Sequence, residues 1–153
     1  MNRIASFTVN HDLLDRGVYV SRIDGDAVTY DIRMKKPNGG DYISPKALHT
    51  IEHLLATYVR NSMHSDRIIY AGPMGCRTGF YLVARDNVTK AEIIGLLRKT
   101  FQFIAGFQGE IPGSKREECG NYLEHDLADA RIEADEYLSV LETVTEYTMN
   151  YKE

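Results

Sequence analysis

The stretch Ser44–Asn61, SPKALHTIEHLLATYVRN, constrains the chain more than any other because it joins helix signals to a metal-binding spacing. Ser44 can cap the free N–H groups of a helix start, Pro45 suits the first helical position, and Asn61 offers a left-handed stop. At about 100° per residue, the apolar residues gather on one side of such a helix. These residues are Leu48, Ile51, Leu54, Leu55, Tyr58 and Val59. The stretch therefore predicts an amphipathic helix.

The opposite side of this helix carries His49, Glu52 and His53, which form the pattern H-x-x-E-H. Histidines four residues apart can direct two imidazoles at one metal ion, with the glutamate one helical step away. The alternative is a solvated polar face, which any amphipathic helix has. Two ligands leave a metal site incomplete, so a further ligand must come from elsewhere in the chain.

Cys119 is the candidate third ligand. It precedes Gly120 in a loop before a predicted helix, and a His₂Cys set would bind Zn²⁺ or Fe²⁺ with its fourth position open. The alternative is a small buried hydrophobic residue, the commonest fate of a free cysteine. His125 competes for the role of ligand, but its expected place inside a helix favours a capping or surface role.

Cys76 is the second thiol of interest. It lies in a glycine-rich turn beside Arg77, where a neighbouring cation could favour the thiolate and allow proton exchange near neutral pH. The alternative is an inert turn cysteine. Arg33, at the end of a predicted strand, would bind an anionic group or form an ion pair at the sheet edge.

Hydrophobic patterning predicts an α+β fold, with an antiparallel β-sheet and helices packed on one face. A hairpin is expected around Asp24-Gly25-Asp26, and Thr89 with Glu92 forms a capping box that starts a second helix. A third helix is expected from about Tyr122 or Leu123 to Val144. The expected strands are Ile4–Val9, Val18–Ile23, Val28–Met34, Arg67–Ala71 and Gly79–Arg85. The length fits one domain, residues 1–153.

Composition excludes several classes of function. The net charge of −4 argues against binding to nucleic acid or to an anionic membrane surface. No apolar run approaches the roughly 20 residues of a membrane span, and the N-terminal MNRIASFTVNHD lacks the apolar core of a signal peptide. We therefore expect a cytoplasmic protein, in which the two cysteines stay unpaired.

Four segments, SFTVNH, HTIEHLLATYVRN, PMGCRTGFYLV and CGNYLEHDL, together resemble the S-ribosylhomocysteine lyase (LuxS) family. They occur in the family's order through nearly the whole chain, and the resemblance implies a LuxS-like metalloenzyme fold. Carried over by motif, it implies three metal ligands, an acid–base pair and three substrate-site residues. The metal ligands would be His49, His53 and Cys119, and the acid–base pair would be Glu52 and Cys76. The substrate-site residues would be Ser6, His11 and Arg33.

The resemblance also implies a reaction. S-ribosylhomocysteine would undergo metal-assisted carbonyl migration by two enolisations and then β-elimination, giving homocysteine and 4,5-dihydroxy-2,3-pentanedione. The second product would be the autoinducer-2 precursor of quorum sensing, whereas homocysteine would return to the methyl cycle; the resemblance leaves open whether the protein serves signalling or only this recycling. The implied cofactor is one Fe²⁺ per subunit, with Zn²⁺ or Co²⁺ as substitutes. The implied assembly is a homodimer with active sites at the interface.

Two positions depart from the family pattern: Tyr70 stands at a usual aspartate and Gly72 at a usual serine. Both concern substrate contacts and leave the metal and acid–base positions intact. Two other interpretations stay open. A metallopeptidase would add a distal carboxylate ligand, for which Glu118 and Glu124 are available. A non-catalytic metal-binding module would instead close a four-ligand site, for example with His125.

Overall fold

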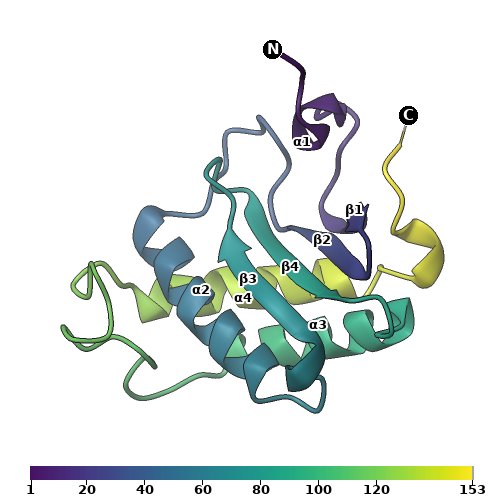
Figure 1. Ribbon diagram of the computed structural model, residues 1–153. Helices are drawn as coiled ribbons and strands as arrows, with labels where there is room; N and C mark the ends of the chain where they lie inside the picture. The colour runs from purple at the N-terminus through teal and green to yellow at the C-terminus, as the bar shows by residue number, and fades with distance from the viewer. Residues whose placement is uncertain (153) are drawn as a thin grey trace.

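The computed structural model describes residues 1–152, which form a four-stranded antiparallel sheet with three helices on one face (Figure 1). The strands, in spatial order, are β1 (Gly17–Asp24), β2 (Ala27–Arg33), β4 (Gly79–Arg85) and β3 (Ile68–Pro73). The covering helices are α2 (Pro45–Arg60), α3 (Lys90–Ala105) and α4 (Leu127–Leu141). The α+β prediction is confirmed.

The predicted hairpin is also confirmed, because β1 and β2 pair from Gly17 opposite Arg33 to Asp24 opposite Ala27. Gly25 in the turn has a φ of 60°, a left-handed conformation that glycine adopts without steric cost. The hairpin gives the sheet its first two strands and leaves β2 free to pair with β4.

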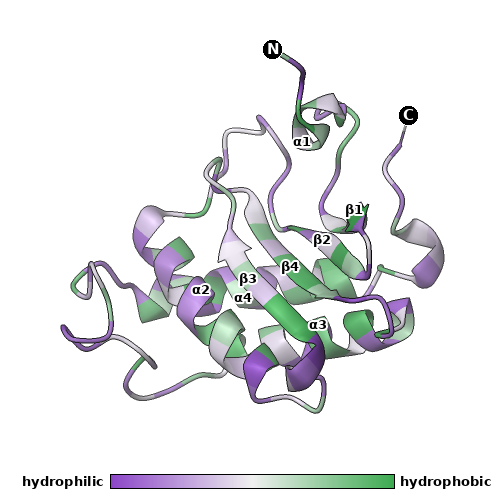
Figure 2. Ribbon diagram, viewed as in Figure 1, coloured by the Kyte–Doolittle hydropathy of each residue, from purple (hydrophilic) through white to green (hydrophobic). Residues whose placement is uncertain are grey.

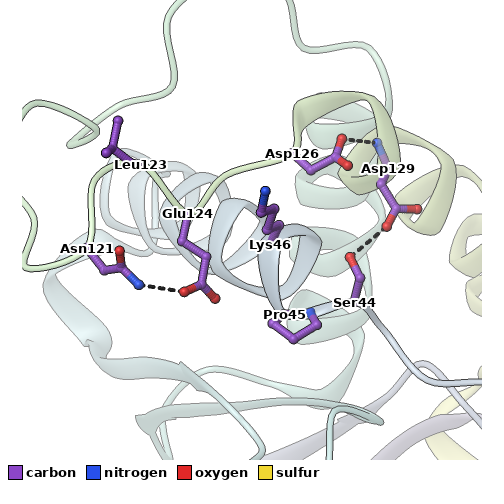
Figure 3. Close-up of a pocket in the computed structure, with 8 residues that line it drawn as sticks. All are labelled: Ser44, Pro45, Lys46, Asn121, Leu123, Glu124, Asp126 and Asp129. Carbon is purple, nitrogen blue, oxygen red and sulfur yellow. Dashed lines mark hydrogen bonds between the residues drawn. The ribbon is translucent and has the colours of Figure 1, made fainter.

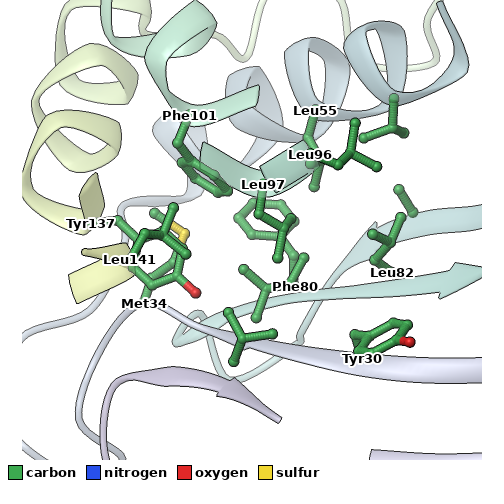
Figure 4. Packing of buried hydrophobic residues seen from close by; sticks show 14 of the residues in the cluster. Tyr30, Met34, Leu55, Phe80, Leu82, Leu96, Leu97, Phe101, Tyr137 and Leu141 are labelled. Atoms are coloured by element: carbon green, nitrogen blue, oxygen red, sulfur yellow. The ribbon is translucent and has the colours of Figure 1, made fainter. Parts of the chain in front are cut away.

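Alternate residues of the strands build the core against the helices. The cross-strand pairs Val28–Ala84, Tyr30–Leu82 and Ile32–Phe80 are all buried. Figure 4 shows Tyr30, Phe80 and Leu82 of the sheet facing Leu97 and Phe101 of α3. The sheet therefore has one face covered by α2, α3 and α4, and an outer face that none of these helices covers.

Helix α2 has the predicted bounds and the predicted start. The Ser44 hydroxyl accepts a hydrogen bond from the Ala47 N–H, and Pro45 occupies the first turn. Figure 2 shows both hydrophobic and hydrophilic residues along α2, and all its buried residues except Thr50 are apolar, so the helix is amphipathic. The left-handed stop predicted at Asn61 is wrong: its φ is −110°, and its backbone N–H bonds to the Tyr58 carbonyl.

The strand predicted at Ile4–Val9 is wrong. Residues Ala5–Thr8 form the short helix α1, closed by hydrogen bonds from the Phe7 N–H to the Ile4 carbonyl and from the Thr8 hydroxyl to the Ala5 carbonyl. A loose alternation over six residues fits one helical turn as well as a strand, and within residues 1–152 no strand pairs with it.

The third helix starts later and ends earlier than predicted, at Leu127 and Leu141. Asp126 is its N-cap and accepts a 2.9 Å hydrogen bond from the Asp129 N–H, so residues 122–126 lie outside the helix.

The capping box of α3 is present as predicted, with Thr89 and Glu92 each bonding the other's backbone N–H. Two 3₁₀ turns, η1 (Ser65–Arg67) and η2 (Glu146–Thr148), complete the elements. Within residues 1–152, no helix has both the length and the apolar character of a membrane span.

Candidate metal centre

Three predicted ligands meet between α2 and the loop that follows α3. His49 and His53 lie one turn apart on α2, and their Nε2 atoms are 3.0 Å apart. Cys119 comes from the loop, with its Sγ 3.4 Å from Nε2 of His49 and 3.9 Å from Nε2 of His53. The sequence therefore identified three side chains that converge in space.

Backbone carbonyls orient both imidazoles. The Nδ1 atom of His49 lies 2.6 Å from the Glu124 carbonyl oxygen, and Nδ1 of His53 lies 2.8 Å from the Pro112 carbonyl oxygen. Because a carbonyl oxygen can only accept, each Nδ1 carries the proton and each Nε2 presents a lone pair. This arrangement, with a carbonyl behind each histidine, is the usual support of a metal ligand.

The donor atoms fit a tetrahedral divalent ion. Two Nε2 lone pairs 3.0 Å apart with no proton between them repel each other unless a cation lies nearby. Ligand bonds of the usual lengths to zinc would separate the two nitrogens by about 3.3 Å and each nitrogen from the sulfur by about 3.6 Å. The observed separations of 3.0, 3.4 and 3.9 Å each lie within about 0.3 Å of these values, so His49, His53 and Cys119 could hold one ion.

His125 belongs to the same cluster, which corrects its predicted position inside a helix. It precedes α4, and its donor atom lies with those of His49, His53 and Cys119 in a group within 4.8 Å of one another. Its ring stacks on His49 at 4.1 Å, and its Nδ1 lies 2.9 Å from the Thr50 hydroxyl.

Burial, followed by the charges of His49 and His53, lowers the pKa of His125 to about 4. Its buried Nε2 has no hydrogen-bond partner within residues 1–152. The cap residue Asp126, three before Asp129, was the sequence signal that His125 lies outside the helix.

Glu52 lies beside this cluster in sequence, between the two histidines, and is half-buried. Within the described residues 1–152, its carboxylate has no hydrogen-bond or ion-pair partner. The structure therefore leaves an unengaged carboxylate one helical step from the two histidines.

Cys76 and Arg33 form a second group, joined through Thr78. Arg33 binds Asp31 through two nitrogens, at 3.1 and 2.6 Å, and its Nη1 donates to the Thr78 hydroxyl at 2.7 Å. The Sγ of Cys76 lies 3.0 Å from the same hydroxyl. Burial alone would lower the pKa of Arg33, but the Asp31 carboxylate, with a further contribution from Cys76, outweighs burial and raises it. The neighbouring Arg77 points elsewhere, donating to the Ile43 carbonyl, so the cation linked to the thiol is Arg33.

Ser6 and His11 lie in a third region, at the N-terminal end of the chain. Ser6 lines a small cavity with Ser21, Thr29 and Tyr81 on the outer face of the sheet. His11 is half-buried, and its Nδ1 bonds to the Val9 carbonyl at 2.9 Å. Among residues 1–152, no hydrogen bond joins the metal-ligand cluster, the Cys76 group and this region.

The two departures from the family pattern are structurally coupled. Tyr70 is 55% exposed, and its ring lies over Gly72, two residues along β3. A Cβ added at Gly72 would clash with the Tyr70 hydroxyl, so a serine at this position requires the tyrosine ring to move. Glycine at residue 72 therefore accommodates tyrosine at residue 70.

A cavity of about 670 Å³ adjoins the cluster at the starts of α2 and α4 (Figure 3). Its polar side chains bond to one another: the Ser44 hydroxyl donates to Asp129 at 2.7 Å, and Asn121 donates to Glu124. Since Glu124 also supplies the carbonyl that holds His49, these contacts join the two helix starts around the metal-ligand cluster.

Comparison with known proteins agrees with this geometry. A family model described as S-Ribosylhomocysteinase (LuxS) matches residues 4–148. The S-ribosylhomocysteine lyases of Phocaeicola vulgatus and Porphyromonas gingivalis are 50% and 48% identical to this chain. Each alignment covers 99% of this chain and at least 98% of the relative. The lyase of Clostridium acetobutylicum is 47% identical, with both chains fully covered. The chain belongs to the S-ribosylhomocysteinase (LuxS) family.

Proposed function

We propose that this protein is an S-ribosylhomocysteine lyase, which converts S-ribosylhomocysteine to homocysteine and 4,5-dihydroxy-2,3-pentanedione. Membership of the family supports this reaction. The observation that carries it is the convergence of His49, His53 and Cys119, with Glu52 unengaged beside them. We assign the whole sequence, residues 1–153, to one lyase domain.

His49, His53 and Cys119 are proposed to hold one divalent ion per subunit, Fe²⁺ in the native enzyme, with Zn²⁺ or Co²⁺ as substitutes. Two imidazoles and one thiolate suit these metals, and a fourth position stays open. When bound, the ion supplies Lewis-acid stabilisation of negative charge on the substrate oxygens.

Glu52 and Cys76 are proposed to move the protons. Each enolisation removes a proton from one carbon of the sugar chain and returns a proton to its neighbour, so the carbonyl migrates without net oxidation. In the final step, loss of a proton from the carbon next to the C–S bond expels homocysteine as a thiolate, which is then protonated. Both groups must therefore exist in protonated and deprotonated forms during turnover.

Ser6, His11 and Arg33 are proposed as substrate-site residues, and the active unit is proposed to be a homodimer with its sites at the interface. Two features support the dimer. The outer face of the sheet is not covered by the three large helices, and Ile4, Phe7 and Leu13 expose apolar side chains near the N-terminus. A second subunit on this side would bring the separate groups of site residues together.

Replacing the acid–base residues tests the reaction. Glu52→Gln and Cys76→Ser should keep the bound metal and lower turnover by roughly two to four orders of magnitude, the usual contribution of a positioned acid or base. Metal analysis and homocysteine release measure the two properties, and carbon NMR with labelled substrate would show an accumulated ketose. Wild-type turnover by Cys76→Ser would exclude the thiol from the chemistry.

The same two variants test whether a site is shared between subunits. If one subunit supplies Glu52 and its partner supplies Cys76, each mixed dimer regains one intact site, and random mixing restores about a quarter of the wild-type activity. We expect this recovery, because no contact links Cys76 to the metal-ligand cluster within residues 1–152. A mixture that stays inactive, in spite of proven subunit exchange, would assign both residues to one subunit.

The family match and the three relatives give no support to a metallopeptidase or to a non-catalytic metal-binding module. We further infer a cytoplasmic location without nucleic-acid or membrane partners. The net charge of −4 and the two free cysteines, Cys76 and Cys119, support this inference.

A further inference from the structure

Thr78 lies between the Arg33 guanidinium and the Cys76 thiol. Its hydroxyl oxygen is 2.7 Å from Nη1 of Arg33 and 3.0 Å from Sγ of Cys76. Thr78 and Arg33 are each only 2% exposed, so water does not screen their contact, whereas Cys76 is exposed. Among residues 1–152, this hydroxyl is therefore the side-chain group that contacts both the cation and the sulfur.

The direction of the hydrogen bonds follows from the chemistry of the three groups. A guanidinium can only donate, so the Thr78 oxygen accepts from Arg33 and keeps its own proton available. That proton can point to Sγ of Cys76 at 3.0 Å or to Sδ of Met74 at 3.9 Å. The shorter distance favours Cys76, and a thiolate is the stronger acceptor of the two.

We propose that Thr78 is a positioning residue that transmits the positive charge of Arg33 to Cys76 and holds this sulfur as a thiolate. The inference rests on the proposed acid–base role of Cys76. The Thr78 backbone is fixed as well, because its carbonyl accepts from the Met34 N–H at 2.8 Å and the Lys35 N–H at 3.0 Å. The threonine is therefore anchored to the segment that directly follows β2, and its hydroxyl contacts Cys76 in the β3–β4 turn.

The other charged and titratable groups around Cys76 are already engaged. Asp31 is paired with Arg33 and accepts a 2.6 Å hydrogen bond from the Tyr151 hydroxyl. Tyr81 on β4 has a pKa raised by burial first, with smaller contributions from Asp31 and Cys76, so it stays neutral near pH 7. Arg33 is therefore the cation that can stabilise the thiolate, and Thr78 is its contact.

Alkylation by iodoacetamide as a function of pH tests the proposal, because only the thiolate reacts. The metal-loaded enzyme is used, and mass spectrometry of peptides separates Cys76 from Cys119. In Thr78→Val, which keeps the shape and loses the hydroxyl, we expect Cys76 to react about tenfold more slowly at pH 7. The pH of half-maximal rate should rise by about one unit. Thr78→Ser should restore the wild-type profile.

Thr100→Val is the matched control, since the Thr100 hydroxyl is equally buried and, among residues 1–152, bonds only to the Leu96 carbonyl inside α3. An unchanged alkylation profile in folded Thr78→Val would overturn the proposal. Should that variant not fold, thiolate absorbance near 240 nm in the wild-type protein decides, compared with Cys76→Ser at pH 7. Absence of a Cys76 thiolate there would also overturn it. Neither measurement involves turnover, so failure of this inference is distinguishable from failure of the proposed reaction.

Discussion

At the residue scale, single hydrogen bonds decide which atoms of the metal centre can bind an ion. The carbonyls of Glu124 and Pro112 hold the protons of His49 and His53 on Nδ1 and leave both Nε2 atoms free. A glutamine in place of either histidine could not both donate to the carbonyl and present a lone pair to an ion. An amide group has its hydrogen-bond donor and its acceptor at the same end of the side chain.

Cys119→Ala should lose metal binding and activity together. The substitution removes the sulfur that lies within 4 Å of both Nε2 atoms, and two imidazoles alone hold a divalent ion weakly. Metal content after gel filtration, measured by mass spectrometry, checks the result, with Cys76→Ala as the thiol control that keeps its metal. Full, tightly bound metal in Cys119→Ala would show that His125 can replace the thiolate.

The residues of the cluster were predictable to different degrees. His49 and His53 follow from helical spacing, because residues four apart share a face whatever surrounds the helix. Cys119 rested on its thiol chemistry and on family resemblance. His125 was misplaced because Tyr122 and Leu123 extend the apolar pattern of the helix toward its start and conceal the cap at Asp126. The link of Cys76 to Arg33 through Thr78 depends on pairing between strands distant in sequence, which no local pattern reveals.

At the scale of elements, the loop between α3 and α4 carries much of the metal centre. It supplies Cys119 and the two carbonyls, while α2 supplies both histidines. The loop approaches α2 closely at Gly113, which has a φ of 71° and lies against the His53 ring.

Gly113→Ala should weaken metal binding by roughly tenfold to a hundredfold, the usual effect of disturbing a ligand's support. An added Cβ would lie 3.1 Å from Nδ1 of His53 and displace the Pro112 carbonyl that holds it. Titration against a chelating indicator measures the affinity. Gly109→Ala is the control, because its φ of 108° strains an L residue at least as much, with no atom within 4 Å of the new Cβ. Equal losses in both variants would attribute the effect to strain alone.

Lys35 connects the segment after β2 to α4, and its contribution to stability should depend on pH. Its Nζ lies 2.7 Å from Glu133 and 3.1 Å from Asp41, and the side chain is buried. Burial alone would lower the pKa of Lys35, but the hydrogen bonds to Glu133 and Asp41 outweigh it and raise the pKa above 10.5. The stabilisation is therefore complete below about pH 10.5 and is lost as the pH rises through the folded-state pKa.

Lys35→Met should lower the free energy of unfolding by roughly 2–3 kcal/mol at pH 8, less than for a fully buried pair because Asp41 reaches solvent. The difference from wild type should shrink at pH 11. Urea denaturation at both pH values measures it. Lys36→Met is the control: Lys36 is half-exposed, and its loss should cost less than about 1 kcal/mol. If the difference in free energy of unfolding between Lys35→Met and wild type did not change with pH, lost packing would explain it and the lost charge would not.

The elements that the sequence predicted correctly are those whose start or turn is fixed by hydrogen bonds within one short segment. The Ser44 cap, the Asp24-Gly25-Asp26 turn and the Thr89 capping box each fix a short segment through its own hydrogen bonds, and all three are present. The segment Ile4–Val9 was mispredicted because its conformation lacks such a signal and no strand is available for pairing within residues 1–152.

At the scale of the whole molecule, the sheet divides the chain into a helical side that carries the metal centre and an outer side that carries Ser6. The sequence predicted the two layers, because alternation in β2 and β4 gives each strand a buried face. It did not predict the distance between the groups of site residues, since that distance depends on how the subunits of the proposed dimer pack.

The convergence of α2 and the loop on one cluster has a consequence for the lifetime of the protein. A bound ion would tie Cys119 to His49 and His53 and so close residues 106–126 into tethered rings, much as a disulfide does. We expect chelation to release this segment, and limited trypsin digestion to cut it at Lys115 or Arg116 in the chelated protein first. Metal supply would then set the resistance of this protein to proteolysis as well as its activity.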